Sequence, residues 1–136
     1  MNKIIVAASG YFNPIHVGHL EYLEKAKKLG DFLIVIVNTD RQVVIKGSKP
    51  FMGEIDRLQI VRGLSCVDYA LLAMDEDGSV CKTLEFIRPH IFAKGGDRHW
   101  GNVPENTVCE SLNIKIVDGL GEKIRSSSSI IKAISK

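Results

Sequence analysis

The sequence predicts a single doubly wound α/β domain with a parallel sheet, and three observations lead to this prediction. Short apolar runs rich in β-branched residues recur along the chain, beginning with residues 3–8 and 31–37. These runs are continuously apolar rather than alternating, which is typical of strands that are covered on both faces. Segments with helical spacing of apolar residues separate the runs, and such alternation favours right-handed strand–helix–strand units.

The expected strands and helices follow one another in order. Strands are predicted at residues 3–8, 31–37, 67–72, 90–93 and 114–117. The first helix begins near Val17 or Gly18 and ends at Gly30, because glycine is common just past a helix. Further helical stripes cover 55–61, 80–87 and, more weakly, 105–112, and a last helix follows Ser126. No linker or repeat interrupts the pattern, so residues 1–136 are predicted to form one domain.

Composition narrows the class of protein. Apolar residues make up 45% and charged residues 25% of the chain, as in a globular domain, and the net charge of +2 is too small to favour nucleic-acid binding. The longest apolar run, 32–37, is too short to cross a bilayer, and no signal peptide is expected after Lys3. The three cysteines fit neither a zinc site nor a disulfide framework. We therefore expect a cytoplasmic protein with reduced thiols.

The segment after the first strand is the strongest candidate site, because open α/β sheets bind ligands at the carboxyl ends of their strands. A turn with Gly10 and Pro14 leads into the first helix, and His16 and His19 lie three residues apart at its start. That spacing places both imidazoles on one side of the helix. Unpaired amides, the helix dipole and the small Gly18 between the histidines suit a triphosphate. The imidazoles would donate hydrogen bonds to phosphate oxygens, and their protonated forms would stabilise developing charge.

The same residues carry a resemblance to a known family. Gly10-x-Phe12-Asn13 followed by His16-Val17-Gly18-His19 resembles the signature of the nucleotidyltransferase superfamily that includes the cytidylyltransferases. Downstream, residues 46–50 and 54–57 resemble the lysine loop and the following helix of these enzymes. Residues 92–97 resemble the segment that follows the fourth strand in heptose-phosphate adenylyltransferases, and residues 127–131 resemble the start of their closing helix. The resemblance implies a Rossmann-like fold with a doubly wound, five-stranded parallel sheet.

It also implies a reaction and a set of site residues. A substrate phosphate oxygen attacks the α-phosphorus of a nucleoside triphosphate and pyrophosphate leaves, so that catalysis depends on positioning and charge stabilisation. The resemblance assigns the catalytic roles to His16, His19 and Lys46, with Lys49 as a second loop lysine. The expected nucleotide and phosphate contacts are Gly10, Tyr11, Phe12, Asn13, Gly18, Arg57, Gly95, Gly96, Asp97, Arg125, Ser127, Ser128 and Ser129.

The expected partners are a nucleoside triphosphate, a phosphorylated small-molecule acceptor and a second copy of the chain, with no nucleic acid and no membrane insertion. Mg²⁺ is expected between the phosphates, with most of its ligands from water and the nucleotide. Position 13 departs from the pattern, because many cytidylyltransferases have Asp there, whereas Asn13-Pro14 resembles dinucleotide-forming adenylyltransferases.

Several functions remain open at this point. A heptose-1-phosphate adenylyltransferase-like enzyme is the first hypothesis, and a glycerol-3-phosphate cytidylyltransferase is the second. Nicotinamide-mononucleotide or flavin-mononucleotide adenylyltransferases follow. A nucleotide-sensing module without turnover is the hypothesis from a different class. The choice between ATP and CTP depends on backbone contacts that the sequence does not display.

Overall fold

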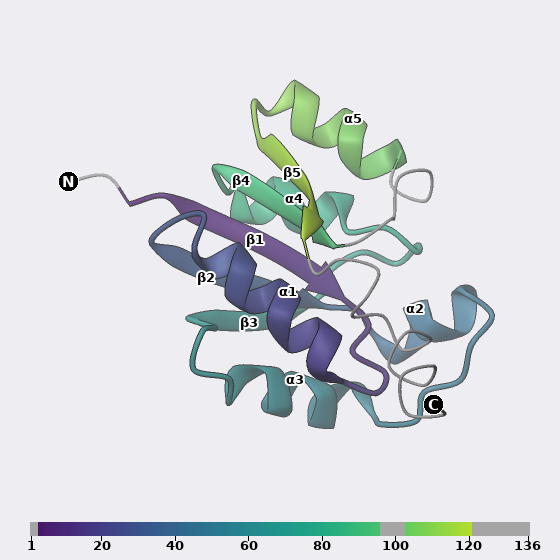
Figure 1. Cartoon of the computed structure of the whole chain (residues 1–136). Helices are drawn as coiled ribbons and strands as arrows, with labels where there is room; N and C mark the ends of the chain where they lie inside the picture. Colours follow the sequence, from purple (N-terminus) through teal and green to yellow (C-terminus); the bar gives the residue numbers. More distant parts are fainter. Residues whose placement is uncertain (1–2, 96–102, 121–136) are drawn as a thin grey trace, which may run out of the picture.

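The computed structural model describes residues 3–95 and 103–120 and contains a parallel sheet with helices on both faces (Figure 1). The strands are β1 (Ile5–Gly10), β2 (Phe32–Val37), β3 (Tyr69–Leu72), β4 (Ile91–Gly95) and β5 (Lys115–Leu120). The helices are α1 (Val17–Lys27), α2 (Asp40–Ile45), α3 (Glu54–Arg62), α4 (Cys81–Ile87) and α5 (Val103–Ser111). The sheet has five strands in the order β3-β2-β1-β4-β5, and all neighbours are parallel.

Alternate residues of the strands build two cores, one on each face of the sheet. Val6 and Ala8 of β1 belong to the core formed with α1 and α3, whereas Ala7 between them belongs to the core formed with α4 and α5. All three side chains are fully buried. Burial on both faces explains why the strands read as continuous apolar runs. The predicted fold class, a doubly wound α/β domain, is therefore confirmed.

The strand and helix boundaries differ from the sequence prediction in a consistent way. Each strand begins one or two residues later than predicted, and β1, β4 and β5 extend further toward their carboxyl ends, β1 to Gly10. Apart from Leu120, these last residues are small or polar, but their backbones still pair, as Gly10 does with Val37. Helix α2 was not predicted, because its six residues bury only Gln42 and Val43 and show no helical stripe. The helix predicted after Ser126 lies outside the described residues.

The sheet order reverses at β1, which pairs with β2 on one side and β4 on the other. Pairing of β1 with β4 ends at Ala8 and Ala93, whereas pairing of β1 with β2 continues to Gly10. The hydroxyl of Tyr22, a residue of α1, lies where the pairing of β1 with β4 stops. It accepts from Ser9 N (3.2 Å) and donates to Ala93 O (2.6 Å). The first helix is thus tied to the point where α/β sheets bind their ligands.

Two other features of the described residues bear on the predictions. The three cysteines are free thiols; Cys109 is buried, and Cys66 and Cys81 are intermediate in exposure. No helix in residues 3–95 and 103–120 is long and apolar enough to span a membrane.

Candidate active site

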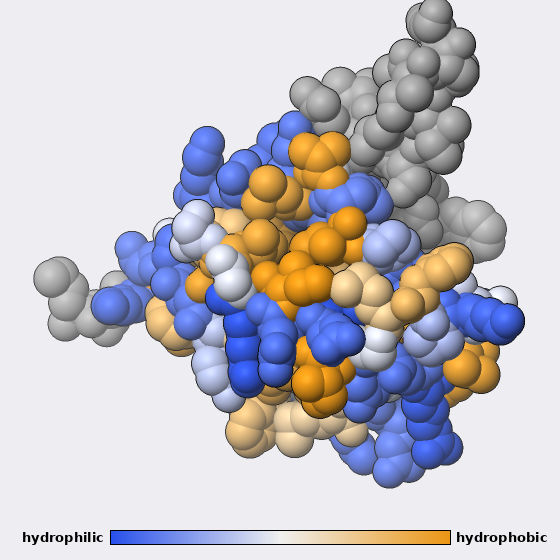
Figure 2. Space-filling model, turned by 90° about the horizontal axis from the view of Figure 1, so that it is seen from below, coloured by the Kyte–Doolittle hydropathy of each residue, from blue (hydrophilic) through white to orange (hydrophobic). Residues whose placement is uncertain are grey.

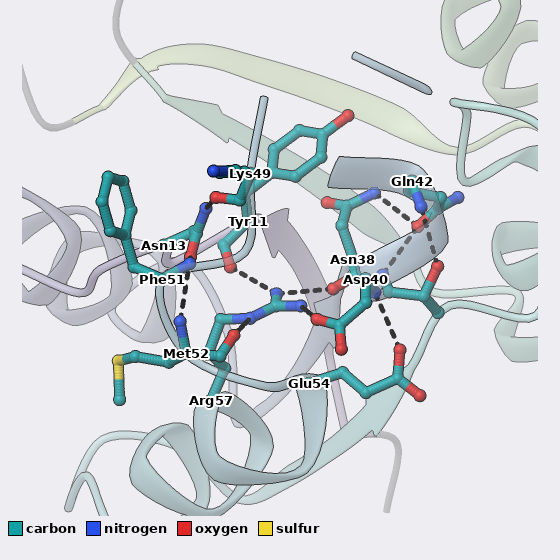
Figure 3. A network of polar contacts seen from close by, with 11 residues as sticks. Tyr11, Asn13, Asn38, Asp40, Gln42, Lys49, Phe51, Met52, Glu54 and Arg57 are labelled. Atoms are coloured by element: carbon teal, nitrogen blue, oxygen red, sulfur yellow. Dashed lines mark hydrogen bonds and ion pairs between the residues drawn. The ribbon is translucent and has the colours of Figure 1, made fainter. Parts of the chain in front are cut away.

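Two segments meet at the carboxyl end of β1 and form the candidate site. One is the first turn, residues 11–16, which leads into α1. The other is residues 46–53, which we name the lysine loop, between α2 and α3. Figure 3 shows the polar contacts that join them, with Arg57 between the two segments. The sequence-predicted residues His16, His19 and Lys46 are brought together here.

The paired histidines cap α1 with their own rings. Nδ1 of His16 accepts from Gly18 N (3.0 Å), and Nδ1 of His19 accepts from His16 N (3.1 Å). The ring centroids of His16 and His19 lie 3.9 Å apart, and the ring centroids of Phe12 and His19 lie 5.0 Å apart in an edge-to-face arrangement. Because each Nδ1 is an acceptor, the proton of each neutral ring belongs on Nε2. The pair therefore presents two Nε2–H donors.

This arrangement corrects two expectations about the helix start. The protonated forms expected for the histidines are disfavoured: burial, then His16 and Lys46, lower the pKa of His19 to about 4, and burial lowers the pKa of His16. A proton on Nδ1 would also oppose the backbone N–H that this atom now accepts. The amide of Gly18 was expected to be open to phosphate, but it already donates to His16. Neutral imidazoles, rather than helix amides, thus offer the donors.

Gly10 and Phe12 shape the floor of the first turn. Phe12 is 1% exposed and has φ of 51°, so its ring is part of the core and only its backbone can meet a ligand. A Cβ added at Gly10 would lie 2.8 Å from Phe12 Cζ, which is closer than non-bonded carbon atoms approach one another in proteins. Glycine at position 10 is therefore required by the packing of Phe12.

Lys46 directly follows helix α2, a helix that the sequence analysis did not predict. It is the C-cap of α2, and its Nζ lies 4.1 Å from the centroid of the Tyr11 ring. Gly47 has φ of +91° and donates to Val44 O (2.9 Å), and Ser48 N donates to Val43 O (3.0 Å). These two bonds form a Schellman motif, which needs a left-handed residue at Gly47. The end of α2 thus determines the position of the Lys46 backbone.

The structure shows Arg57, which was predicted to contact phosphate, in a structural position, because its buried guanidinium donates four hydrogen bonds to groups of the protein. The side chain is completely buried. Nε donates to Met52 O (3.0 Å), Nη1 to Tyr11 O (2.7 Å) and Asn38 O (2.6 Å), and Nη2 to Asp40 Oδ1 (2.6 Å). Figure 3 shows these groups converging on the guanidinium. Arg57 joins the first turn, the end of β2 and the lysine loop.

Asn13 contacts the same loop. Its Oδ1 accepts from Phe51 N (2.7 Å) and Met52 N (3.4 Å), and its Nδ2 donates to Lys49 O (2.8 Å). Both ends of the amide are therefore occupied by backbone groups. Among the described residues no group of three or more His, Cys, Asp or Glu side chains could hold a metal ion.

Sequence reasoning missed two buried charged residues, Glu105 of α5 and Lys94 of β4. Glu105 is 6% exposed; its Oε2 accepts from Val80 N (3.0 Å), and its Oε1 has no hydrogen-bond partner among residues 3–95 and 103–120. Burial, with a smaller contribution from Glu105, raises the pKa of Tyr11. Lys94 is 5% exposed and donates to Asn106 Oδ1 (2.9 Å). A Glu in a first helical turn is common, and no local pattern marks this one as buried.

The remaining predicted residues are only partly described. Gly95 ends β4, pairs with Leu120 and packs near the Tyr22 ring. The other predicted nucleotide contacts lie outside the described residues: Gly96, Asp97, Arg125, Ser127, Ser128 and Ser129.

Comparisons with known proteins agree with the geometry. The model of the family described as cytidylyltransferase-like matches residues 7–134. Bifunctional protein HldE of Citrifermentans bemidjiense is 41% identical over 97% of this chain, which spans only 27% of that relative. FAD synthase of Ferroglobus placidus is 45% identical over 74% of this chain and 62% of its own length. The solved structure of a lipopolysaccharide core biosynthesis protein from Thermoplasma volcanium has a TM-score of 0.76 and 34% identity, and covers 86% of this chain and 96% of that one.

Proposed function

The chain belongs to the cytidylyltransferase-like family, and we propose that it transfers a nucleoside monophosphate from a nucleoside triphosphate to a phosphorylated small molecule. The observation that carries the proposal is the pair of neutral imidazoles at the start of α1. Each has Nδ1 engaged by a backbone N–H, so each directs an Nε2–H donor to a ligand. Lys46 adds positive charge close enough to lower the pKa of His19.

The reaction that fits this site needs no covalent enzyme intermediate. An oxygen of the acceptor phosphate attacks the α-phosphorus, the bond from that phosphorus to the bridging oxygen breaks, and pyrophosphate leaves with the electron pair. The Nε2–H groups of His16 and His19 donate to phosphate oxygens on which negative charge grows, and Lys46 supplies the positive charge that neutral imidazoles lack. Mg²⁺ bound to the nucleotide would neutralise further charge, with ligands from phosphate and water.

We propose a sugar phosphate as the acceptor and a heptose-1-phosphate adenylyltransferase-like reaction in the synthesis of a lipopolysaccharide or other cell-surface precursor. The similarity to bifunctional protein HldE and to a lipopolysaccharide core biosynthesis protein supports this choice. Adenylyl transfer to flavin mononucleotide is the second candidate, favoured by the similarity to FAD synthase. Glycerol-3-phosphate with CTP and nicotinamide mononucleotide with ATP complete the set. Because nucleoside triphosphates are made in the cytoplasm, we place the reaction there.

The test is pyrophosphate release with magnesium, in which ATP and CTP are crossed with heptose-1-phosphate, flavin mononucleotide, glycerol-3-phosphate and nicotinamide mononucleotide. ATP with heptose-1-phosphate is the expected productive pair. The His19→Ala variant should be about a hundredfold slower with that pair, the usual effect of one lost charge-stabilising donor. No turnover with any pair, together with tight binding of ATP or CTP, would instead support a nucleotide-sensing module.

We also propose that the protein forms a homodimer through the face that carries α3. Figure 2 shows hydrophobic residues gathered in the centre of the face below the molecule as drawn in Figure 1. Ile55 and Ile60 of α3 are 54% and 39% exposed, and Tyr69 of β3, the outer strand of the described sheet, is 51% exposed. An exposed strand edge is able to pair with another chain, and a large exposed apolar patch marks an interaction site. Light scattering after gel filtration should give twice the chain mass, and the monomer mass would refute the proposal.

A further inference from the structure

We propose that Asn13 is a positioning residue: its amide holds the return half of the lysine loop against the first turn and so positions Lys49, whereas the end of α2 positions Lys46. The proposal depends on the proposed function in one respect, that Lys49 contacts the phosphates of the substrates. The hold on the loop itself follows from contacts within the chain.

The three hydrogen bonds of Asn13 need both halves of an amide. Oδ1 accepts from Phe51 N (2.7 Å) and Met52 N (3.4 Å), and Nδ2 donates to Lys49 O (2.8 Å). The partners are 36 to 39 residues away along the chain. Figure 3 shows the Asn13 side chain lying between Lys49 and Phe51. A carboxylate has the same shape but only acceptors, so it would oppose the Lys49 carbonyl.

Burial contributes little to the position of this loop. The side chain of Phe51 is 76% exposed, and residues 46–49 are exposed throughout. The loop is instead held by hydrogen bonds at three points: the Schellman motif at Gly47, the amide of Asn13, and Arg57 Nε donating to Met52 O (3.0 Å). The first fixes the start of the loop and the last fixes its end. Asn13 is the contact that fixes Lys49, which lies between them.

This role explains why an uncharged residue occupies position 13. Both polar ends of the Asn13 amide face backbone groups of the loop, so the side chain is not directed to a metal ion or to an acceptor. Asn13 also lies three residues before His16, in the first turn. Arg57 Nη1 donates to the backbone of the same turn at Tyr11 O (2.7 Å). The lysine loop and the histidines are therefore fastened to the same short segment. A change at Asn13 would alter the loop without touching the imidazole rings.

The test compares Asn13→Asp with Asn113→Asp, which adds the same charge at an exposed position after α5. Two readouts do not depend on activity: hydrogen exchange at the Phe51 amide, and the initial rate of tryptic cleavage after Lys46. Both should rise about tenfold in Asn13→Asp and stay at the wild-type rate in Asn113→Asp. If only a tenth of the loops are in place, the KM for the triphosphate should rise about tenfold while kcat changes less than twofold.

Unchanged exchange and cleavage in Asn13→Asp would overturn the proposal, whatever the activity. A looser loop with an unchanged KM would also overturn it, because the contact of Lys49 with the triphosphate would then not depend on Asn13. A looser loop in a protein that turns over no substrate would leave the hold by Asn13 supported and would refute the proposed function instead. In case the variant does not fold, the wild-type protein gives a further test: the Phe51 amide must exchange more slowly than a free peptide, although its ring is exposed.

Discussion

Acid should destabilise this protein through His19, and the structure gives the pH range of the effect. Burial in the first place, then His16 and Lys46, lower the pKa of His19 from 6.5 to about 4. Between these values an unfolded chain binds a proton at His19 that the folded chain does not. Stability decreases as the pH is lowered wherever the unfolded state binds more protons than the folded state. The full contribution is therefore present above the unfolded pKa and is lost as the pH falls toward the folded pKa.

The size of the effect follows from the pKa difference. One pKa unit corresponds to about 1.4 kcal/mol, so the shift of His19 sets an upper limit of about 3 kcal/mol on the loss. The same two pKa values give a loss of about 2 kcal/mol at about pH 5. Protonation of His19 converts its Nδ1 from a hydrogen-bond acceptor into a donor. Protonated Nδ1 can no longer accept from His16 N, and the capping interaction of α1 is broken.

Urea unfolding at about pH 7.5 and about pH 5 measures this loss, and His19→Gln is the matched variant. Gln at this position of a helix accepts from the N-cap amide, as His19 does, but it does not titrate. We expect the wild-type protein to lose about 2 kcal/mol more than His19→Gln between the two pH values. Equal losses in the two proteins would show that His19 is not held neutral by its surroundings, and the reasoning about the imidazole pair would fail.

Three substitutions test the contacts around the site. Tyr22→Phe leaves Ser9 N and Ala93 O without their hydroxyl partner and should cost about 2 kcal/mol in urea unfolding. Arg57→Ala leaves buried carbonyls and a carboxylate unpaired and should cost about 3 kcal/mol or more by the same measurement. Gly47→Ala meets no atom within 4 Å, so its cost of about 1 kcal/mol comes from positive φ alone, and calorimetry should show a lower Tm.

Each of these predictions has an outcome that contradicts it. Tyr69→Phe removes a hydroxyl from a half-exposed tyrosine, and a stability loss equal to that of Tyr22→Phe would mean that the bonds to the β1–β4 junction contribute nothing special. A stable Arg57→Ala variant with impaired triphosphate binding would contradict the structural role of Arg57 and support the predicted phosphate contact. An unchanged Tm in Gly47→Ala would mean that the end of α2 does not need a left-handed residue.

The sequence alone was sufficient for the fold class and for the histidine pair, because both depend on neighbours along the chain. Burial on both faces leaves continuous apolar runs, and a helix between strands leaves a stripe of apolar residues. His16 and His19 lie within one helical turn, so their spacing already places them together. The lysine loop was also identified from its residues, although α2 before it was too short to leave a pattern.

The tertiary structure alone decided the roles of Asn13, Arg57 and Glu105. Arg57 donates to a carbonyl 46 residues away, and Asn13 accepts from an amide 38 residues away. Glu105 reaches Val80 across 25 residues. From the sequence, an arginine near a phosphate motif is predicted to be a phosphate ligand, and only the structure shows that the guanidinium of Arg57 is buried and donates to Tyr11 O and Asn38 O. Hydrogen bonds over such separations arise only when the sheet brings distant turns to one edge, so no local pattern records them.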